Sequence, residues 1–301
     1  MQRRIFLLLI FLIFLVYVTI YCSLSDSKSK NANDVINSDR EPVFVTVCCN
    51  RSEEILVMIK SALIFSKHRI KFVIISEKIL FRGLQETLSE YEARFPNFSY
   101  SLMETSFPAG HDWSSLFKPC ASQRLFLASM LPYDKIVYVD SDTIFLSPPH
   151  DFVEQFKEFN ATQFIGISSE IEDENIGWYP RFARHPYYGN YGVNSGVMLM
   201  KLDKMRQLKW ERQITDIYET FNTRIVFGDQ DLINIYFSSN PQQLFLMPCE
   251  FNYRPDHCMF LMCPAKEGIK LIHGNRGYFH KEDNESIFIL IYEAFRKVKS
   301  N

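Results

Sequence analysis

Two aspartates with one residue between them directly follow the apolar run 136–139, and this pattern could bind a metal ion. Side chains alternate along an extended chain, so Asp140 and Asp142 project the same way and can reach one hard divalent cation. The carboxyl end of a strand is also where open α/β sheets bind ligands. A cation held there could carry a diphosphate. The alternative is an ordinary turn whose carboxylates bond to nearby backbone N–H groups.

A histidine at a second strand end extends this acidic pair. His273 closes the apolar run 269–272 and precedes Gly274, which marks a turn. Two carboxylates and an imidazole, with positions left open for phosphate oxygens, suit Mn²⁺ better than Zn²⁺. Such an ion stabilises the charge that develops on a departing diphosphate. We therefore expect Asp140, Asp142 and His273 to be the metal ligands, and the alternative for His273 is a structural role.

The elements that must position these residues follow from the apolar pattern, which alternates between strand and helix from residue 43 onward. We expect strands at 43–49, 70–75, 100–103, 135–139, 144–146, 164–168, 193–202, 244–247 and 269–272, and helices at 53–65, 84–95, 118–130, 205–221, 230–237 and 286–298. This alternation predicts an α/β fold with a doubly wound sheet. Without a repeat or a boundary in 43–301, we expect one domain on a single sheet, with a nucleotide-binding half before an acceptor-binding half.

The segment before residue 43 has a different composition. Arg3 and Arg4 precede an apolar run over residues 5–22, which is long enough to cross a bilayer core of about 30 Å. We expect a cytosolic tail at 1–4, a transmembrane signal anchor at 5–22, a polar stem at 23–42 and a luminal catalytic domain at 43–301. The alternative is a cleaved signal peptide, which leaves the domain in the same compartment. Lys and Arg number 33 against 35 Asp and Glu, so no basic field indicates nucleic acid as a partner.

The cysteines and glycosylation motifs fit a luminal domain. Four Asn-x-Ser/Thr sites occur, at Asn50, Asn97, Asn160 and Asn284. Six cysteines follow the predicted anchor, and an even number in an oxidising compartment permits disulfides. We expect bridges among Cys249, Cys258 and Cys263, with Cys120 as a further partner. The adjacent Cys48 and Cys49 are expected to be buried thiols, and the lack of Cys-x-x-Cys spacing argues against a zinc site.

Longer motifs carry a resemblance to a known family. They lie at residues 116–127, 138–143, 177–189, 192–200, 228–232, 252–258 and 273–277. Together they resemble the glucoside xylosyltransferases of glycosyltransferase family 8, over about residues 43–298. The resemblance implies a GT-A fold, a Rossmann-like mixed sheet flanked by helices, and a single-pass type II protein of the Golgi or endoplasmic reticulum membrane. It also implies a retaining enzyme that uses UDP-xylose and Mn²⁺ and adds α-1,3-linked xylose to O-linked glucose on EGF-like repeats of Notch-type proteins.

The resemblance also assigns roles to single residues. It implies that Asp140, Asp142 and His273 are the metal ligands, with Asp140 also near the ribose, and that Asn194 and Ser195 contact the donor sugar. It places Asp229 and Gln230 at the reacting centre. Arg276 is the implied diphosphate contact, at a position where many members have a lysine. Asp229 is either a nucleophile, as in retaining glycosidases, or with Gln230 a positioning and electrostatic group. We favour the second role, in a same-face substitution where the leaving phosphate takes the acceptor proton.

Two further segments have aromatic and basic side chains that suit an acceptor. The first is the loop 178–191, with Trp178, Tyr179, Arg181, Arg184 and His185; the second contains Tyr253, Arg254 and His257. For both, the alternative is a packed structural segment. Two other functions remain open: a family 8 transferase that uses another UDP-hexose or a xylose-terminated acceptor, and a non-catalytic sugar-binding relative.

Overall fold

The structure is a computed structural model that describes residues 41–116, 120–281 and 286–298. The described residues belong to one compact unit, Glu41–Asn301. The predicted tail and anchor, and the predicted stem up to residue 40, lie outside the described residues. Among the helices that are described, none has the length and apolar character needed to cross a membrane.

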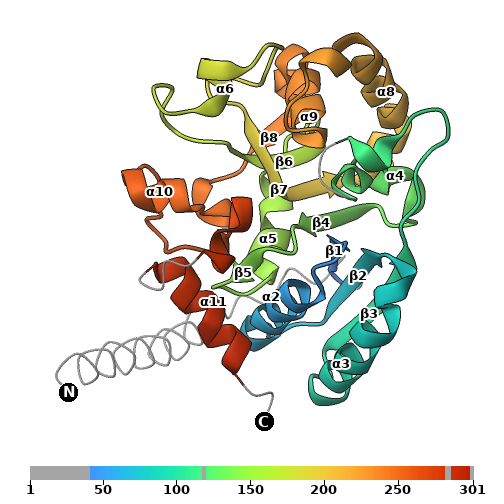
Figure 1. The fold of residues 1–301 in the computed structure, drawn as a ribbon, viewed down its shortest axis with the longest axis vertical. Coiled ribbons are helices and arrows are strands. Elements are labelled where there is room, and N and C mark those ends of the chain that lie inside the picture. Colours follow the sequence, from blue (N-terminus) through green and yellow to red (C-terminus); the bar gives the residue numbers. More distant parts are fainter. Residues whose placement is uncertain (1–40, 117–119, 282–285, 299–301) are drawn as a thin grey trace. The chain divides into compact units, whose positions relative to one another are not determined.

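A seven-stranded mixed sheet forms the centre of this unit, in the order β3-β2-β1-β4-β7-β6-β8 (Figure 1). The strands are β1 Val43–Cys48, β2 Ile70–Ser76, β3 Phe98–Glu104, β4 Lys135–Val139, β6 Ile165–Ser169, β7 Val193–Lys201 and β8 Leu244–Leu246. The first four are parallel, β7 is antiparallel to both β4 and β6, and β8 is parallel to β6. The predicted α/β fold with a mixed, helix-flanked sheet is therefore confirmed.

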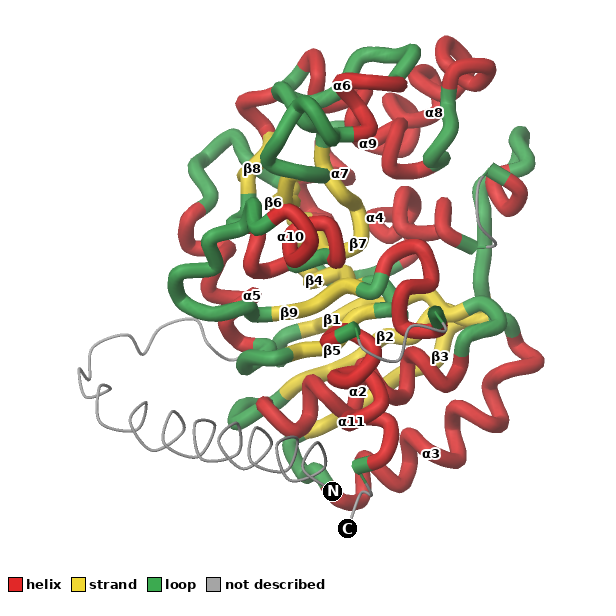
Figure 2. Tube along the Cα trace, turned by 60° about the vertical axis from the view of Figure 1, so that its left-hand side comes forward, coloured by secondary structure: helices red, strands yellow, loops and turns green. Residues whose placement is uncertain are grey.

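Helices cover both faces of the sheet (Figure 2). One face is covered by α2 Ser52–Phe65, α3 Phe81–Arg94 and α5 His150–Glu154, and the other by α4 Leu127–Met130, α7 Leu202–Gln207, α8 Trp210–Phe221 and α9 Asp229–Ser239. Strand β1 serves both apolar cores, since Phe44 packs in one and Val45 in the other, as the two-residue period of a strand requires. Helix α11 Ile287–Lys297 packs on α2 in a third cluster.

A second, two-stranded sheet lies beside the first and is not predicted from the sequence. Strands β5 Thr143–Phe145 and β9 Leu271–His273 pair antiparallel, with Thr143 opposite His273. The chain leaves β4 at the acidic pair, where the Thr143 hydroxyl donates to the Asp140 carbonyl over 2.8 Å. The expectation of a single sheet is therefore wrong, because this turn sends β5 away from the main sheet. The pairing brings His273 to the two aspartates.

Most of the predicted elements occur within about three residues of their expected positions, but two expected helices differ. The helix expected at 205–221 is two helices, α7 and α8, because Lys209, which lies between them, has a φ of 53°. Over the described part of 118–130, a 3₁₀ segment at Ala121–Phe126 precedes the short α4, after Cys120 with a φ of 63°. The loop expected at 178–191 contains the short helix α6 Trp178–Phe182.

Two disulfides connect four of the six described cysteines: Cys49 with Cys120, and Cys249 with Cys263. The expectation that Cys258 forms a bridge is wrong, because it lies exposed on helix α10 Pro255–Phe260. The expectation for Cys48 holds and that for Cys49 fails. Adjacent side chains at a strand end point to opposite sides, so Cys48 is buried in the core while Cys49 reaches Cys120. Burial raises the pKa of the Cys48 thiol.

Candidate active site

The three predicted metal ligands lie together at the carboxyl end of β4. Ligand atoms of Asp140, Asp142 and His273 all lie within 4.8 Å of one another. The His273 Nε2 atom is 3.3 Å from Asp142 Oδ1 and 3.7 Å from Asp140 Oδ2. Two carboxylates and one imidazole at such distances suit a divalent cation with open positions for other ligands. These residues could hold a divalent metal ion.

A glycine on β7 allows the histidine to come this close. An added Cβ at Gly196 would lie 2.2 Å from Cε1 of His273, a distance that real Cβ contacts do not show. The backbone carbonyl of Gly196 also accepts a 2.8 Å hydrogen bond from the Asp140 N–H, which fixes β7 beside the acidic pair. Gly196 is not among the predicted site residues, although a glycine inside an apolar strand often marks a close approach.

A buried arginine joins the acidic pair to the predicted reacting centre. The Arg124 guanidinium lies 2.9 Å from Asp140 Oδ1 and 3.0 Å from Asp229 Oδ2. It also donates to the Ser195 carbonyl over 2.8 Å and stacks over the Tyr138 ring at 4.8 Å. Arg124 is not among the predicted site residues. The available signal was a lone charge within the apolar end of the motif 116–127.

Burial and charge shift the pKa values of this cluster. Burial raises the pKa of Asp229 to about 6, while Arg124 opposes that shift and Asp140 adds to it. Burial lowers the pKa of Arg124, but the carboxylates of Asp140 and Asp229 outweigh it and the net change is upward. Arg124 is therefore a permanent cation between two acidic groups, which offsets the cost of keeping them close.

The residues predicted to contact the donor sugar lie next to this cluster. Helix α9 begins at Asp229, directly after Gly228 with a φ of 55°, and its first turn faces the start of β7. Gln230 Oε1 accepts from the Ser195 N–H over 3.2 Å, and Asn194 Nδ2 donates to Glu170 Oε2 over 2.8 Å. Gln230 Nε2 donates to the same Glu170 oxygen over 3.3 Å. The structure thus brings Asn194, Ser195, Asp229 and Gln230 together. Glu170, which sequence reasoning missed, contacts Asn194 and Gln230.

Arg276, the predicted diphosphate contact, is not part of this cluster. Its guanidinium pairs with Asp256 on α10, and its side chain is 63% exposed. The residue has a φ of 61° and is followed by Gly277 with a φ of 69°, so the chain turns sharply after His273. The turn directs the arginine toward α10 and not toward the two aspartates.

The aromatic and basic loop 178–191 divides into a fixed part and an exposed part. The Tyr179 hydroxyl donates to Asp231 Oδ1 over 2.8 Å, and His185 Nε2 lies 3.3 Å from Asp231 Oδ2. Tyr179 and His185 are buried, while Arg181 and Arg184 are exposed. The structural interpretation therefore fits Tyr179 and His185, and the two arginines remain available to a ligand.

The segment around Arg254 is a scaffold. Arg254 is completely buried and donates to the Ser169 carbonyl over 2.7 Å, which attaches this segment to the end of β6. The Arg254 N–H donates to His257 Nδ1 over 3.0 Å. Just before it, the buried Asn252 contacts both His273 and Asn194. Arg254 and His257 therefore stabilise the segment that presents Asn252 to the site.

The sequence of this chain matches a known protein family. The model of "Glycosyl transferase family 8" matches residues 42–275. The chain belongs to this family. Mouse glucoside xylosyltransferase 2 is 43% identical over 270 residues, covering 84% of this chain and 61% of that protein. Mouse glucoside xylosyltransferase 1 is 44% identical over 269 residues, covering 84% of this chain and 66% of that protein. This chain therefore spans slightly less than two thirds of the length of these two relatives.

Solved structures share the same GT-A fold. Mouse xyloside xylosyltransferase 1 in its apo form has a TM-score of 0.59 at 19% identity, covering 79% of this chain and 99% of that one. The galactosyltransferase LgtC in complex with donor and acceptor sugar analogs has a TM-score of 0.64 at 16% identity, covering 86% and 96%. At these identities the likeness concerns the fold alone. The resemblance to family 8 in the sequence motifs is thus confirmed.

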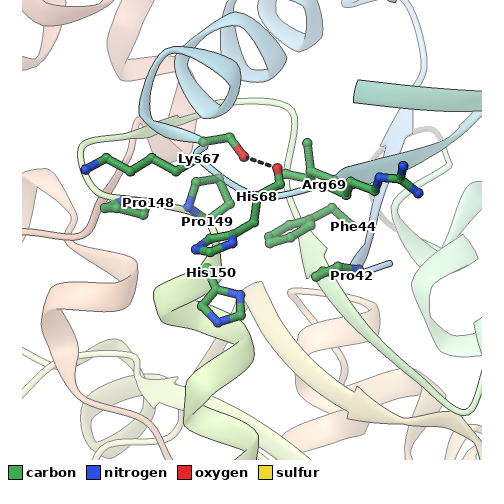
Figure 3. A pocket seen from close by; sticks show the side chains of 10 residues that line it. Pro42, Phe44, Lys67, His68, Arg69, Pro148, Pro149 and His150 are labelled. Atoms are coloured by element: carbon green, nitrogen blue, oxygen red, sulfur yellow. Dashed lines mark hydrogen bonds between the residues drawn. The ribbon is translucent and has the colours of Figure 1, made fainter. Parts of the chain in front are cut away.

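A pocket elsewhere on this family 8 fold is separate from the site. It is lined at the amino ends of β1 and β2 by Pro42, Phe44, Ser66, Lys67, His68, Arg69, Ile70, Pro148, Pro149 and His150 (Figure 3). The His68 and His150 rings lie 4.7 Å apart there. Because β1 and β4 are parallel, this edge is opposite the one that carries Asp140 and Asp142. None of the predicted site residues lines it.

Proposed function

We propose that this protein is a retaining glycosyltransferase that moves xylose from UDP-xylose, in α-1,3 linkage, to O-linked glucose on EGF-like repeats of Notch-type proteins. One observation carries the proposal: the acidic pair and His273 lie within 4.8 Å of one another, beside the cluster of Asn194, Asp229 and Gln230. The identity of over 40% to proteins named glucoside xylosyltransferases supports this donor and acceptor. The name of these relatives gives a glucoside as the acceptor. The proposal that this glucoside is carried by an EGF-like repeat rests on the sequence resemblance.

The proposed mechanism uses the chain's own residues in separate roles. A bound Mn²⁺ would supply Lewis acidity toward the diphosphate. Asn194 and Ser195 orient the sugar, and Arg124 keeps the Asp229 carboxylate 3.0 Å from its guanidinium. As a nucleophile, Asp229 would have to leave this ion pair, so the geometry favours a positioning and electrostatic role for Asp229 and Gln230. The leaving phosphate then takes the acceptor proton on the same face of the sugar.

Arg276 has a conditional role in this proposal. To reach the diphosphate, its side chain must leave Asp256. The left-handed backbone at Arg276 and Gly277 is the place where such a change would occur. Arg181 and Arg184, which are exposed at the edge of the loop 178–191, are the proposed contacts to the protein part of the acceptor.

The proposed location is the lumen of the Golgi or endoplasmic reticulum, with residues 5–22 as a type II signal anchor. Its supports are the unbroken apolar run in the sequence and the two disulfides, which form and persist in oxidising compartments. Nucleic acid is not a proposed partner, because the formal net charge is −2.

A donor competition tests the proposed activity. The purified full chain is incubated with Mn²⁺, a glucosylated EGF-like repeat and UDP-xylose, UDP-glucose or UDP-galactose. We expect transfer from UDP-xylose to exceed the others and to vanish with a repeat that lacks glucose. Preference for a hexose donor, or for a xylose-terminated repeat, would show the alternative transferase. Binding without any transfer would show a sugar-binding relative.

The metal ligands provide the first prediction. Asp142→Asn removes a charged ligand, so Mn²⁺-dependent turnover should fall by about two orders of magnitude or more. The melting temperature in the presence of a chelator should stay nearly unchanged. Asp216→Asn on α8, where the carboxylate is 66% exposed, is the matched control and should keep full turnover. Full turnover in Asp142→Asn would refute the metal-site assignment.

A further inference from the structure

A chain of hydrogen bonds connects the metal histidine to the sugar-contacting residues. His273 Nδ1 lies 2.9 Å from Asn252 Oδ1, and Asn252 Nδ2 lies 2.9 Å from Asn194 Oδ1. Asn194 Nδ2 lies 2.8 Å from Glu170 Oε2. The side chains of His273, Asn252 and Asn194 are all buried. We call Glu170, Asn194, Asn252 and His273 the amide relay.

Two groups with fixed hydrogen-bonding roles determine the direction of this relay. The backbone N–H of Gly196 can only donate, and it lies 3.1 Å from Asn194 Oδ1, so that atom must be the amide oxygen. An ionised Glu170 can only accept, so the atom of Asn194 that faces it must be the NH₂ group. Both contacts require the same orientation of the Asn194 amide, which removes the usual ambiguity between its two ends.

The orientation of Asn194 determines that of its neighbour. Because Asn194 Oδ1 accepts, Asn252 must present its NH₂ group there and its oxygen to His273. The Asn252 NH₂ group also lies 3.4 Å from the Asn194 carbonyl, a second acceptor that favours the same orientation. An amide oxygen cannot donate, so the His273 Nδ1 atom must carry a proton.

We infer that Asn252 and Asn194 are positioning residues that hold His273 with its proton on Nδ1, so that Nε2 is the atom offered to the cation. Nε2 is the nitrogen that lies 3.3 Å from Asp142 and 3.7 Å from Asp140. The opposite neutral tautomer would place two lone pairs together between Nδ1 and Asn252 and a proton where the cation must bind. Histidine ligands of metals generally have such a partner on the other ring nitrogen.

The same relay links the metal site to the sugar site. Glu170 receives hydrogen bonds from both Asn194 and Gln230, so the group that fixes one end of the relay also fixes the amide at the proposed reacting centre. A change at Asn252 therefore reaches Asn194 as well as His273. This inference rests on the proposed metal role of His273, but it does not depend on which sugar is transferred.

The protonation of His273 can be observed directly. In the metal-free full chain with ¹⁵N-labelled histidine in alkaline buffer, we expect His273 to carry its proton on Nδ1 and none on Nε2. The His273→Gln variant assigns the signal. A spectrum in which Nδ1 lacks the proton would overturn the inference. The measurement needs neither nucleotide nor acceptor, and a structural role of Asn252 alone would not fix the tautomer.

Two substitutions at Asn252 separate the loss of its hydrogen-bond acceptor from the loss of its side-chain volume. Asn252→Ala removes the acceptor for Nδ1, and calorimetry with Mn²⁺ alone should show an affinity about 10- to 100-fold weaker. Asn252→Asp keeps an oxygen facing Nδ1, so Mn²⁺ should bind at least as tightly as in the wild type. In Asn252→Asp, however, the Asn194 side-chain oxygen no longer accepts a hydrogen bond from residue 252, so the KM for UDP-xylose should rise.

The outcomes distinguish this inference from the proposed function. Asn222→Ala, an exposed asparagine on the turn after α8, is the matched control and should bind Mn²⁺ like the wild type. Wild-type affinity in Asn252→Ala, or Asn252→Asp as weak as Asn252→Ala, would overturn the inference. A wild type with the expected tautomer and Mn²⁺ affinity that transfers a hexose instead of xylose would refute only the proposed donor.

Discussion

Gly196 lets His273 lie close to the two aspartates because it has no side chain. Gly196→Ala would put a methyl group 2.2 Å from His273 Cε1, so the ring must move away from Asp140 and Asp142. We expect Mn²⁺ affinity to fall by about tenfold or more and the free energy of unfolding to fall by about 1–3 kcal/mol. Calorimetry and urea denaturation measure the two effects.

A second glycine provides the control for this change. Gly83 lies on α3 with nothing within 4 Å of an added Cβ, so Gly83→Ala should leave Mn²⁺ affinity unchanged and stabilise the protein by about 0.5–1 kcal/mol. Equal Mn²⁺ affinities in the two variants would contradict the close approach of β7 to His273.

Asp229 gives a pH-dependent prediction. Burial raises its pKa from 3.8 to about 6, so the folded state binds this proton more tightly than the unfolded state. Its contribution to stability is therefore full below about pH 4 and is lost as the pH rises through about 6. Relative to Asp229→Asn, which has no such proton, the wild type should lose on the order of 3 kcal/mol between about pH 4 and pH 8. Urea denaturation across this range measures the difference, and a constant difference would contradict the raised pKa.

Sequence motifs identify some site residues better than others. Asp140, Asp142 and His273 could be proposed because their types suit a metal and each lies at a strand end. Arg124 is marked only by a lone charge in an apolar segment, and Asn252 by nothing local, because their roles exist through contacts with residues far away in the chain: Arg124 with Asp229, and Asn252 with Asn194. A polar residue that only orients another polar residue has no local pattern in the sequence.

At the scale of elements, Asp231 attaches the loop 178–191 to the start of α9. Its carboxylate accepts from the Tyr179 hydroxyl and from the N–H groups of Val226 and Phe227, the latter two over 2.7 Å. Asp231→Ala removes the acceptor of the buried Tyr179 hydroxyl and of two part-buried backbone N–H groups, so the free energy of unfolding should fall by about 1–3 kcal/mol. Trypsin should also cut faster at the exposed Arg181.

Matched variants separate this attachment from a general loss of charge. Asp231→Asn keeps an oxygen for the two backbone N–H groups and should give an intermediate result. Asp216→Ala removes an exposed carboxylate from α8 and should change neither stability nor the rate of cleavage. Equal cleavage of the loop in Asp231→Ala and the wild type would show that other contacts hold it.

The pattern of apolar residues predicts those helices and strands that are defined by residues close together in the sequence. Strand β4 occurs at its expected residues, because its apolar run is short and rich in β-branched side chains. The pairing of β5 with β9 could not be predicted, since it joins two three-residue strands far apart in the sequence. The break between α7 and α8 depends on the left-handed backbone of Lys209, a residue type that rarely adopts it.

At the scale of the whole described unit, the site lies where the two halves of the chain meet. Strand β7 runs antiparallel to β4, so the start of β7, with Asn194, lies beside the end of β4, with Asp140. In a purely parallel sheet the two would lie at opposite edges. The disulfide between Cys49 and Cys120 adds a covalent link on the other side, from the end of β1 to the segment that carries Arg124.

This disulfide gives a prediction for the protein as a whole. It closes a sequence separation of 71 residues, so the double variant Cys49→Ser/Cys120→Ser should lose about 2–5 kcal/mol of unfolding free energy. Because Arg124 follows Cys120 closely, kcat/KM should fall as well. Cys258→Ser, at the exposed free thiol, should change neither quantity. Denatured, unreduced protein should show Cys48 and Cys258 alkylated, with the four bridged cysteines reacting only after reduction. Alkylation of Cys49 without a reductant would refute the bridge, and with it the link between β1 and the arginine segment.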